Sequence, residues 1–132
     1  MAMAPKFVDT NIFIEILMRN GPKSDRALKL LESGNPLWTT ILAIAEIEWV
    51  LRDWFALPKE QVVDYLKRIL SYQSVEIAER RRLVAAVALY EKEHIDWTDC
   101  YSLVIISEKK QSDLYSFDKD FDKIPGINRL EP

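Results

Sequence analysis

Four acidic residues lie far apart in the chain, and each stands in or beside an apolar segment. They are Asp9 in FVDTN, Glu46 in LAIAEIEWVL, Asp99 in DWTDCYSLVII and Asp118 in LYSFDKD. A carboxylate among apolar side chains is costly to desolvate unless another group compensates its charge. If folding brings the four carboxylates together, they repel each other and require a cation, and hard divalent ions such as Mg²⁺ prefer oxygen ligands. We therefore expect these acids to form a metal site.

Asp9 and Asp118 each follow a predicted strand. Asp9 is the last residue of the short apolar strand KFVD, and Asp118 is the first residue after the strand LYSF. In parallel sheets, ligands bind at the carboxyl ends of the strands, where these two acids fall. Asp is also a common N-cap, so Asp9 could instead begin the helix that follows. Thr10 and Asn11 are N-cap candidates too, and otherwise they would support the metal site through hydrogen bonds.

Glu46 and Glu48 are distinguished by helix geometry. Glu48 has Arg52 four residues later, a spacing at which an ion pair forms on a solvent-exposed helix face. The residues three and four positions from Glu46 are all apolar, namely Leu42, Ala43, Trp49 and Val50. We therefore predict that Glu46 lines a cleft or binds a cation, and that Glu48 faces solvent.

Asp96 and Asp99 lie three residues apart at the start of a predicted helix. At this spacing both side chains can lie on one helix face or serve in the first turn. Capping by Asp96 or Thr98 is the alternative for one of them. Asp99 lies deeper in the helix and an apolar run follows it, so Asp99 is the better candidate for the metal site.

The alternation of Asp118, Asp120 and Asp122 suggests a calcium-binding loop. An EF-hand loop requires glycine at its sixth position, where this chain has Lys123. The calcium hypothesis therefore fails, and we interpret Asp120 and Asp122 as charges of a solvated loop.

Predicted strands alternate with predicted helices along the chain. Strands are expected near 6–9, 37–39, 74–78, 114–117 and 127–130, and helices near 11–18, 23–32, 40–55, 58–70, 79–93 and 98–110. This alternation is typical of a parallel sheet covered by helices on both faces. We expect a single α/β domain over residues 1–132, with three layers, α/β/α, and a short central parallel sheet.

The composition limits the other classes of chemistry. One cysteine, Cys100, and one histidine, His94, are too few for a disulfide or a zinc site, and a lone histidine is a weak candidate for a general base. No signal peptide or membrane-spanning run is evident, so we expect a cytoplasmic protein with no membrane partner. The net charge of −3 does not exclude nucleic acid, because without four metal-bound acids the remaining 17 acids and 18 bases sum to +1.

Basic residues offer contacts for a nucleic-acid backbone. Arg80–Arg82 and Lys109–Lys110 could follow phosphates, although charge runs at helix ends are usually only solvated. Lys119 and Lys123 are better placed, because they lie close to Asp118 in the sequence.

Four segments in order resemble the PIN-domain nucleases, and among them the VapC-type toxins of prokaryotic toxin–antitoxin pairs. The segments are FVDTNIFIEIL, TTILAIAEIEWVLRDWF, IDWTDCYSLVII and LYSFDKDF, and together they cover nearly the whole chain. The acidic positions of the family fall on Asp9, Glu46, Asp99 and Asp118. Asp96 matches a position that is often acidic, and Ser116 matches a small hydroxyl residue before the last acid. Cys100 and Tyr101 depart from the family, in which a small residue and a leucine are common.

The resemblance implies an endoribonuclease that uses Mg²⁺ or Mn²⁺ to hydrolyse RNA. It also implies a homodimer and a small antitoxin protein that inserts a segment across an acidic cleft, where an Arg or Lys would suit the carboxylates. A bound metal would generate the attacking hydroxide and stabilise charge on the phosphate, so no His or Lys base is required. Trp49 and Trp54 either belong to a central core helix or form part of an interface, and the sequence leaves both possibilities open.

Two alternatives come from other classes of protein. The first is a non-catalytic Mg²⁺-binding signalling module, such as a phosphate-accepting domain with an aspartate at a strand end. That class usually has paired acids early in the chain, whereas Asp9 stands alone here, and it leaves Glu46 and Asp99 unexplained. The second alternative is an α/β fold used only as an interaction module.

Overall fold

The computed structural model describes residues 4–132, which form two compact units. The N-terminal unit ends at Arg80 and the C-terminal unit runs from Arg81 to Pro132. The N-terminal unit contains β1 (Lys6–Phe7), α1 (Thr10–Met18), α2 (Pro22–Glu32), β2 (Leu37–Thr39), α3 (Ile41–Trp49), η1 (Val50–Trp54), α4 (Lys59–Leu70) and β3 (Val75–Ile77). The C-terminal unit contains α5 (Arg80–Lys92, whose first residue ends the N-terminal unit), α6 (Trp97–Glu108), β4 (Asp113–Tyr115), η2 (Lys119–Lys123) and β5 (Asn128–Leu130).

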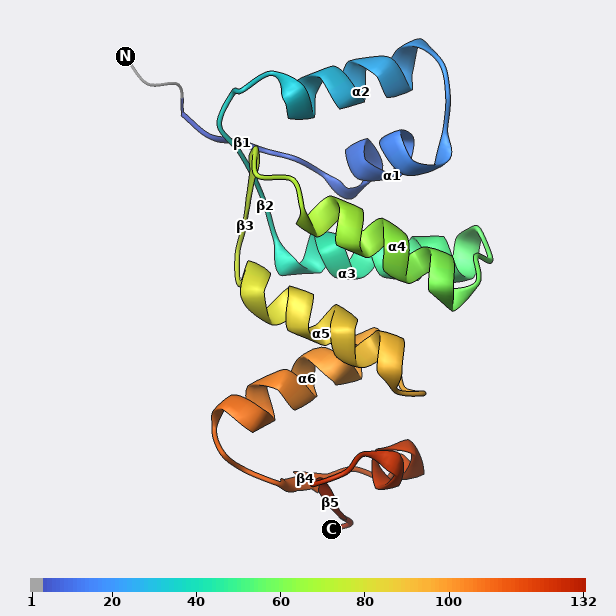
Figure 1. The fold of residues 1–132 in the computed structure, drawn as a ribbon, viewed down its shortest axis with the longest axis vertical. Helices are drawn as coiled ribbons and strands as arrows, with labels where there is room; N and C mark the ends of the chain where they lie inside the picture. Colours follow the sequence, from blue (N-terminus) through green and yellow to red (C-terminus); the bar gives the residue numbers. More distant parts are fainter. Residues whose placement is uncertain (1–3) are drawn as a thin grey trace. The chain divides into compact units, whose positions relative to one another are not determined.

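The three strands of the N-terminal unit form a parallel sheet in the order β1-β2-β3 (Figure 1). β2 is central, with Leu37 opposite both Lys6 and Val75. Leu37 and Thr39 of β2 are buried, and so are Val75 and Ile77 of β3, as the two-residue period of a strand requires. The parallel order places the carboxyl ends of all three strands at one edge of the sheet.

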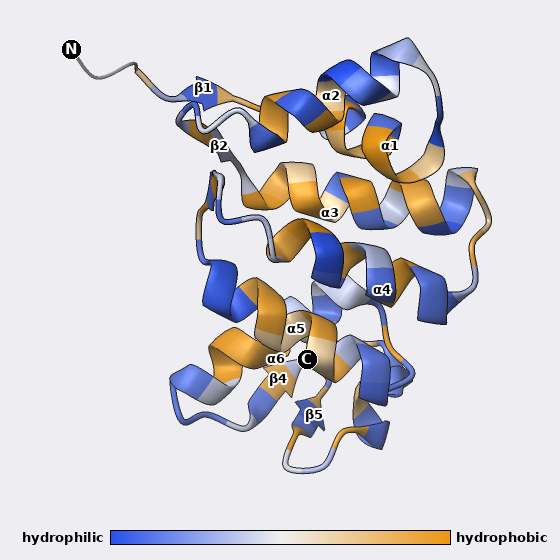
Figure 2. Ribbon diagram, turned by 45° about the horizontal axis from the view of Figure 1, so that its top comes forward, coloured by the Kyte–Doolittle hydropathy of each residue, from blue (hydrophilic) through white to orange (hydrophobic). Residues whose placement is uncertain are grey.

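The helices of the N-terminal unit supply most of its core. α1 packs on α2 and on α3, and α3 packs on α4. Figure 2 shows hydrophobic residues along most of α1 and α3, which fits helices that contact protein on several sides. Side chains that are fully buried in this unit include Phe13, Leu31, Ile44, Ile47, Leu51, Val62, Leu66 and Ile69.

α3 begins with a cap and ends in a wider turn. The Thr40 hydroxyl accepts a hydrogen bond from the Ala43 backbone N–H at 3.1 Å, as an N-cap does. From Val50 onward the chain forms one turn of π-helix, in which the Phe55 N–H donates to the Val50 carbonyl five residues earlier, at 3.0 Å. Ala56, with φ of 52°, then ends the helix.

The structure corrects one prediction about α3. Arg52 pairs with Glu48 as expected, with Nε 3.1 Å from Oε2, but Glu48 is buried, with 3% of its surface exposed. The i,i+4 spacing predicts the ion pair between Glu48 and Arg52, but it does not predict whether Glu48 is buried. Because α3 is apolar on nearly every side, its periodicity does not show which face turns inward.

The C-terminal unit has its own two-stranded parallel sheet, formed by β4 and β5. Arg129 of β5 ties the loop after β4 to this sheet, because its guanidinium donates to the Asp122 carboxylate at 2.9 Å and to the Ser116 carbonyl at 3.0 Å. Cys100 of α6 is buried and is not in a disulfide. None of the helices in residues 4–132 has the length and apolar character needed to cross a membrane.

The α/β class, the parallel pairing and the predicted elements are confirmed. Each expected strand and helix is present, with ends that differ from the prediction by a few residues. The strands form two parallel sheets, one in each unit, and the helix predicted near 40–55 is α3 continued by the π turn.

Candidate functional site

Asp9 lies just beyond the carboxyl end of β1. Val8 before it is buried, and both of its backbone groups are hydrogen-bonded to β2. Its N–H donates to the Trp38 carbonyl and its carbonyl accepts from the Thr39 hydroxyl, each at 2.8 Å. Asp9 occupies the N-cap position of α1, yet its carboxylate makes no capping hydrogen bond to the helix. The side chain is exposed and remains available to a ligand. Asp9 therefore stands at the N-cap position of α1, but its carboxylate does not cap the helix.

Thr10 connects the start of α1 to Glu46 of α3. Its Oγ1 lies 3.1 Å from Glu46 Oε2 and 3.3 Å from the Ala43 carbonyl oxygen, so its single proton is shared between two acceptors. Thr10 is buried, whereas Glu46 is exposed. The hydrogen bond fixes the direction of the Glu46 carboxylate.

A pocket of about 280 Å³ brings these residues together within the N-terminal unit. It is lined by Asp9, Thr10, Asn11, Ile14, Arg19, Glu46, Trp49, Val50, Trp54 and Phe55. Asp9 follows β1 and Glu46 lies in the helix after β2, so two neighbouring parallel strands direct both acids to the same edge. The prediction that Glu46 lines a cleft is confirmed, and Asn11 lines the same cleft.

The surroundings of Asp99 in α6 disfavour the charge of its carboxylate. Burial raises the pKa of the Asp99 carboxyl, and the charges of Asp96, Asp118 and Asp120 raise it further. Asp96 occupies the N-cap position of α6 without a capping hydrogen bond from its side chain. The C-terminal unit thus places four carboxylates near one another, and a cation would relieve their repulsion.

Asp118 follows β4 and begins η2. Its Oδ1 accepts a hydrogen bond from the Asp120 N–H at 2.9 Å, so this acid does act as a helix cap. The Ser116 hydroxyl accepts from the Asp118 N–H, also at 2.9 Å, which holds the backbone before the carboxylate. Ser116 therefore fixes the backbone at Asp118, while the second oxygen of Asp118 is left for another ligand.

Asp120 is closer to the acidic cluster than the sequence indicated. It pairs with Lys123 at 3.1 Å, as a loop charge would, but its charge also acts on Asp99. Asp122 instead pairs with Arg129, which lowers the pKa of the Asp122 carboxyl.

The donor atoms suit a hard divalent ion. Asp9 and Glu46 in one unit, and Asp96, Asp99 and Asp118 in the other, offer carboxylate oxygens and no nitrogen or sulfur. Within residues 4–132, no three Asp, Glu, His or Cys side chains stand close enough to hold one ion as they are arranged. The carboxylates described in each unit are therefore of the chemical kind that a hard divalent ion prefers.

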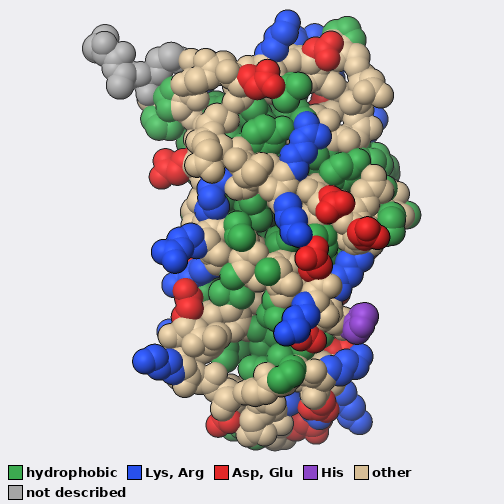
Figure 3. Space-filling model, viewed as in Figure 1, with side chains coloured by type: hydrophobic (Ala, Val, Ile, Leu, Met, Phe, Trp, Pro, Cys, Tyr) green, Lys and Arg blue, Asp and Glu red, His purple; other side chains and the backbone are tan. Residues whose placement is uncertain are grey.

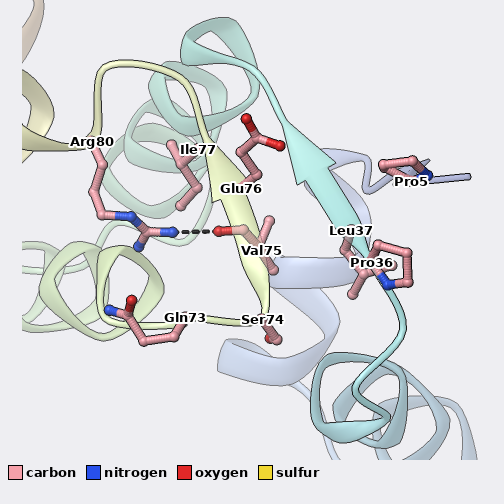
Figure 4. A pocket seen from close by; sticks show the side chains of 9 residues that line it. All are labelled: Pro5, Pro36, Leu37, Gln73, Ser74, Val75, Glu76, Ile77 and Arg80. Atoms are coloured by element: carbon pink, nitrogen blue, oxygen red, sulfur yellow. Dashed lines mark hydrogen bonds between the residues drawn. The ribbon is translucent and has the colours of Figure 1, made fainter. Parts of the chain in front are cut away.

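A second cavity, of about 400 Å³, lies at the opposite ends of the strands (Figure 4). Pro5, Pro36 and Ser74, which precede β1, β2 and β3, are among its lining residues. Arg80 lies beside it and donates hydrogen bonds to the backbone carbonyls of Leu70, Tyr72 and Val75. Arg80 thus stabilises the chain between α4 and β3, which corrects the suggestion that it follows a phosphate backbone.

Asp99→Asn is expected to stabilise the metal-free protein at neutral pH. Because the pKa of Asp99 is raised in the folded state, the folded protein binds more protons there than the unfolded chain, and stability falls as pH rises. Solvent screening of this half-buried group keeps the gain small, roughly 2–4 °C in Tm at pH 7 in EDTA. The difference should vanish at about pH 3 and below, where the wild-type carboxyl is largely protonated in both the folded and the unfolded state. A Tm at pH 7 equal to or below that of wild type would contradict this.

Comparison with known proteins assigns the family. The PIN domain family matches residues 6–127, so the chain belongs to the PIN-domain family. Two solved structures are similar: VapC20 of Mycobacterium tuberculosis, described as a sarcin-ricin loop cleaving toxin, and a toxin–antitoxin complex from Klebsiella pneumoniae. The first is 19% identical with a TM-score of 0.41, covering 89% of this chain and 92% of the other. The second is 19% identical with a TM-score of 0.36, covering 95% and 96%. No curated protein matches the chain.

Proposed function

We propose that this protein is a metal-dependent endoribonuclease that hydrolyses RNA phosphodiester bonds and acts as the toxin of a toxin–antitoxin pair. The observation that supports it most is the PIN-domain match over residues 6–127 together with Asp9 and Glu46 in one pocket at the carboxyl edge of the sheet. The toxin role rests on the resemblance of the four acidic segments to VapC-type toxins. A cytoplasmic location is part of the same proposal.

The catalytic acids in this proposal are Asp9, Glu46, Asp99 and Asp118, with Asp96 as a further ligand. When bound, Mg²⁺ or Mn²⁺ would acidify the attacking water and stabilise charge on the phosphate. Thr10 holds the Glu46 carboxylate at 3.1 Å, and Ser116 holds the backbone of Asp118 at 2.9 Å. Preorganised carboxylates need no reorganisation when substrate binds, which is how such partners increase rate.

We propose that both units act as one domain. The family match spans the boundary at Arg80, and each unit holds only part of the acidic set. A cation shared by acids from both units would relieve the repulsion that raises the pKa of Asp99.

We also propose an antitoxin partner and a homodimer. An Arg or Lys side chain of the antitoxin would pair with Asp9 and Glu46 and so occupy the place of the cation. The homodimer rests on the resemblance of the four acidic segments to VapC-type toxins. Light scattering at micromolar concentration should give the mass of a dimer, and the mass of a monomer would contradict the proposed homodimer.

Incubation of the purified protein with labelled total bacterial RNA tests the activity. Cleavage is expected with Mg²⁺ or Mn²⁺ and not with EDTA, and primer extension would map internal cuts. Cleavage that continues in EDTA would contradict the metal-dependent mechanism. Failure to cut any RNA in the pool would contradict the endoribonuclease assignment.

A further inference from the structure

The pocket that contains Asp9 and Glu46 also has aromatic lining. Trp49, Trp54 and Phe55 belong to it, and the two tryptophans are 52% and 74% exposed. Figure 3 shows hydrophobic side chains at the surface near the turn that follows α3. Tryptophans left in water beside two carboxylates are not explained by the core of this unit or by the metal chemistry of the acids.

The π turn after α3 brings the two tryptophans to one pocket. In an α-helix, residues five apart point about 140° away from each other. Trp49 ends α3 and Trp54 ends η1, and the i→i+5 hydrogen bond from the Phe55 N–H to the Val50 carbonyl, at 3.0 Å, widens this turn. Five residues then make little more than one turn, so both rings line the same pocket. Such π turns are frequent at functional sites.

The pocket also contains a basic side chain, that of Arg19. The Arg19 guanidinium lies 5.9 Å from the centre of the Phe55 ring, and its Nε pairs with Glu15 at 3.2 Å. The Arg19 side chain is 55% exposed, so its charge reaches solvent at the pocket. Carboxylates for a cation, exposed rings and a guanidinium therefore stand in one pocket of about 280 Å³.

We propose that Trp49 and Trp54 form a stacking site for one unpaired RNA base next to the scissile phosphate. The proposal rests on the proposed function, because it places the phosphate at the acids. Single-stranded RNA alternates flat bases with anionic phosphates, which matches rings beside Arg19 and a cation at Asp9 and Glu46. A purely apolar partner segment would leave Arg19, Asp9 and Glu46 without complementary groups. The site selects unpaired RNA, because a base within a duplex is not free to stack on protein.

Fluorescence anisotropy with short labelled single-stranded RNA tests the base contact. Ca²⁺ replaces Mg²⁺ in the buffer, and a matched oligonucleotide lacks one base at the centre but keeps every phosphate. Trp54→Ala should weaken binding of the complete RNA by about 5- to 150-fold, the range seen when a stacked aromatic is lost. Trp54→Phe should recover most of this affinity. Leu42→Ala is the control, because Leu42 lies on the same helix, is 80% exposed and is outside the pocket.

The outcomes separate this inference from the proposed function. The stacking site is wrong if Trp54→Ala and wild type bind the complete RNA with affinities within twofold of each other. It is also wrong if Trp54→Ala weakens binding of the complete RNA and of the abasic RNA by the same factor, wherever the missing base is placed. Absence of measurable RNA binding by wild type would also overturn it. Selective loss with complete RNA supports it even if no cleavage is found with Mg²⁺, and in that case only the nuclease proposal fails. Because Trp54 is 74% exposed, its truncation should leave Tm unchanged.

Discussion

Glu46→Gln should lower RNA cleavage by at least about 100-fold while leaving the free energy of unfolding within about 0.5 kcal/mol of wild type. The amide keeps the shape of the side chain and can still accept from Thr10, so the pocket should stay intact. It removes the negative charge beside Asp9, which the proposed cation requires. Initial rates with labelled RNA and Mg²⁺, together with urea unfolding, measure the two quantities.

Glu48→Gln is the matched control two residues along α3. Glu48 is buried and pairs with Arg52 at 3.1 Å, so the change should lower stability by about 1–3 kcal/mol. Its carboxylate is not part of the pocket lining, and cleavage by the folded fraction should stay near that of wild type. If the two variants lose activity to the same degree, Glu46 has no special role in catalysis.

Arg80→Ala should be the most destabilising of the changes considered, by about 3–5 kcal/mol. The guanidinium donates to the carbonyls of Leu70, Tyr72 and Val75, which close the turn between α4 and β3. Figure 4 shows the contact with Val75. Burial lowers the pKa of Arg80, yet an arginine stays charged at pH 7 and makes charge-assisted hydrogen bonds. Loss of the side chain leaves these carbonyls with fewer donors, and Tm should fall by roughly 10 °C or more.

Arg81→Ala provides the comparison for Arg80. Arg81 is the next residue and is exposed, so its removal should change stability by less than about 0.5 kcal/mol. Thermal unfolding followed by circular dichroism gives both values. Equal Tm values for the two variants would show that the three carbonyl contacts contribute nothing to stability.

The positions of the acids could be predicted because local patterns determine them. The apolar strand before Asp9 and the helix after it set that residue at the carboxyl edge of the sheet, where the structure has it. The apolar neighbours of Glu46 in its helix likewise predicted that it lines a cleft, whereas Ser116 was named only through the family resemblance. A short strand followed by a helix is encoded within a few residues, so no long-range information was needed.

Features that depend on tertiary packing could not be predicted in this way. Glu48 is buried because α3 has neighbours on several sides, and its spacing to Arg52 carries no information on depth. The carbonyls that bind Arg80 are close to it only after β3 has packed. The π turn from Val50 to Trp54 has no signature in the residues that form it, so the shared pocket of the two tryptophans was not foreseen.

Mn²⁺ binding to Asp9→Asn, Asp118→Asn and the double variant tests the shared cation most directly. The two acids come from different units, so the measurement asks whether both act on one site. Calorimetric titration should show at least tenfold weaker binding for each single variant and little further loss in the double variant, since residues of one site are not additive. Independent and additive losses, or unchanged Mn²⁺ affinity in Asp118→Asn, would contradict a metal centre built from both units.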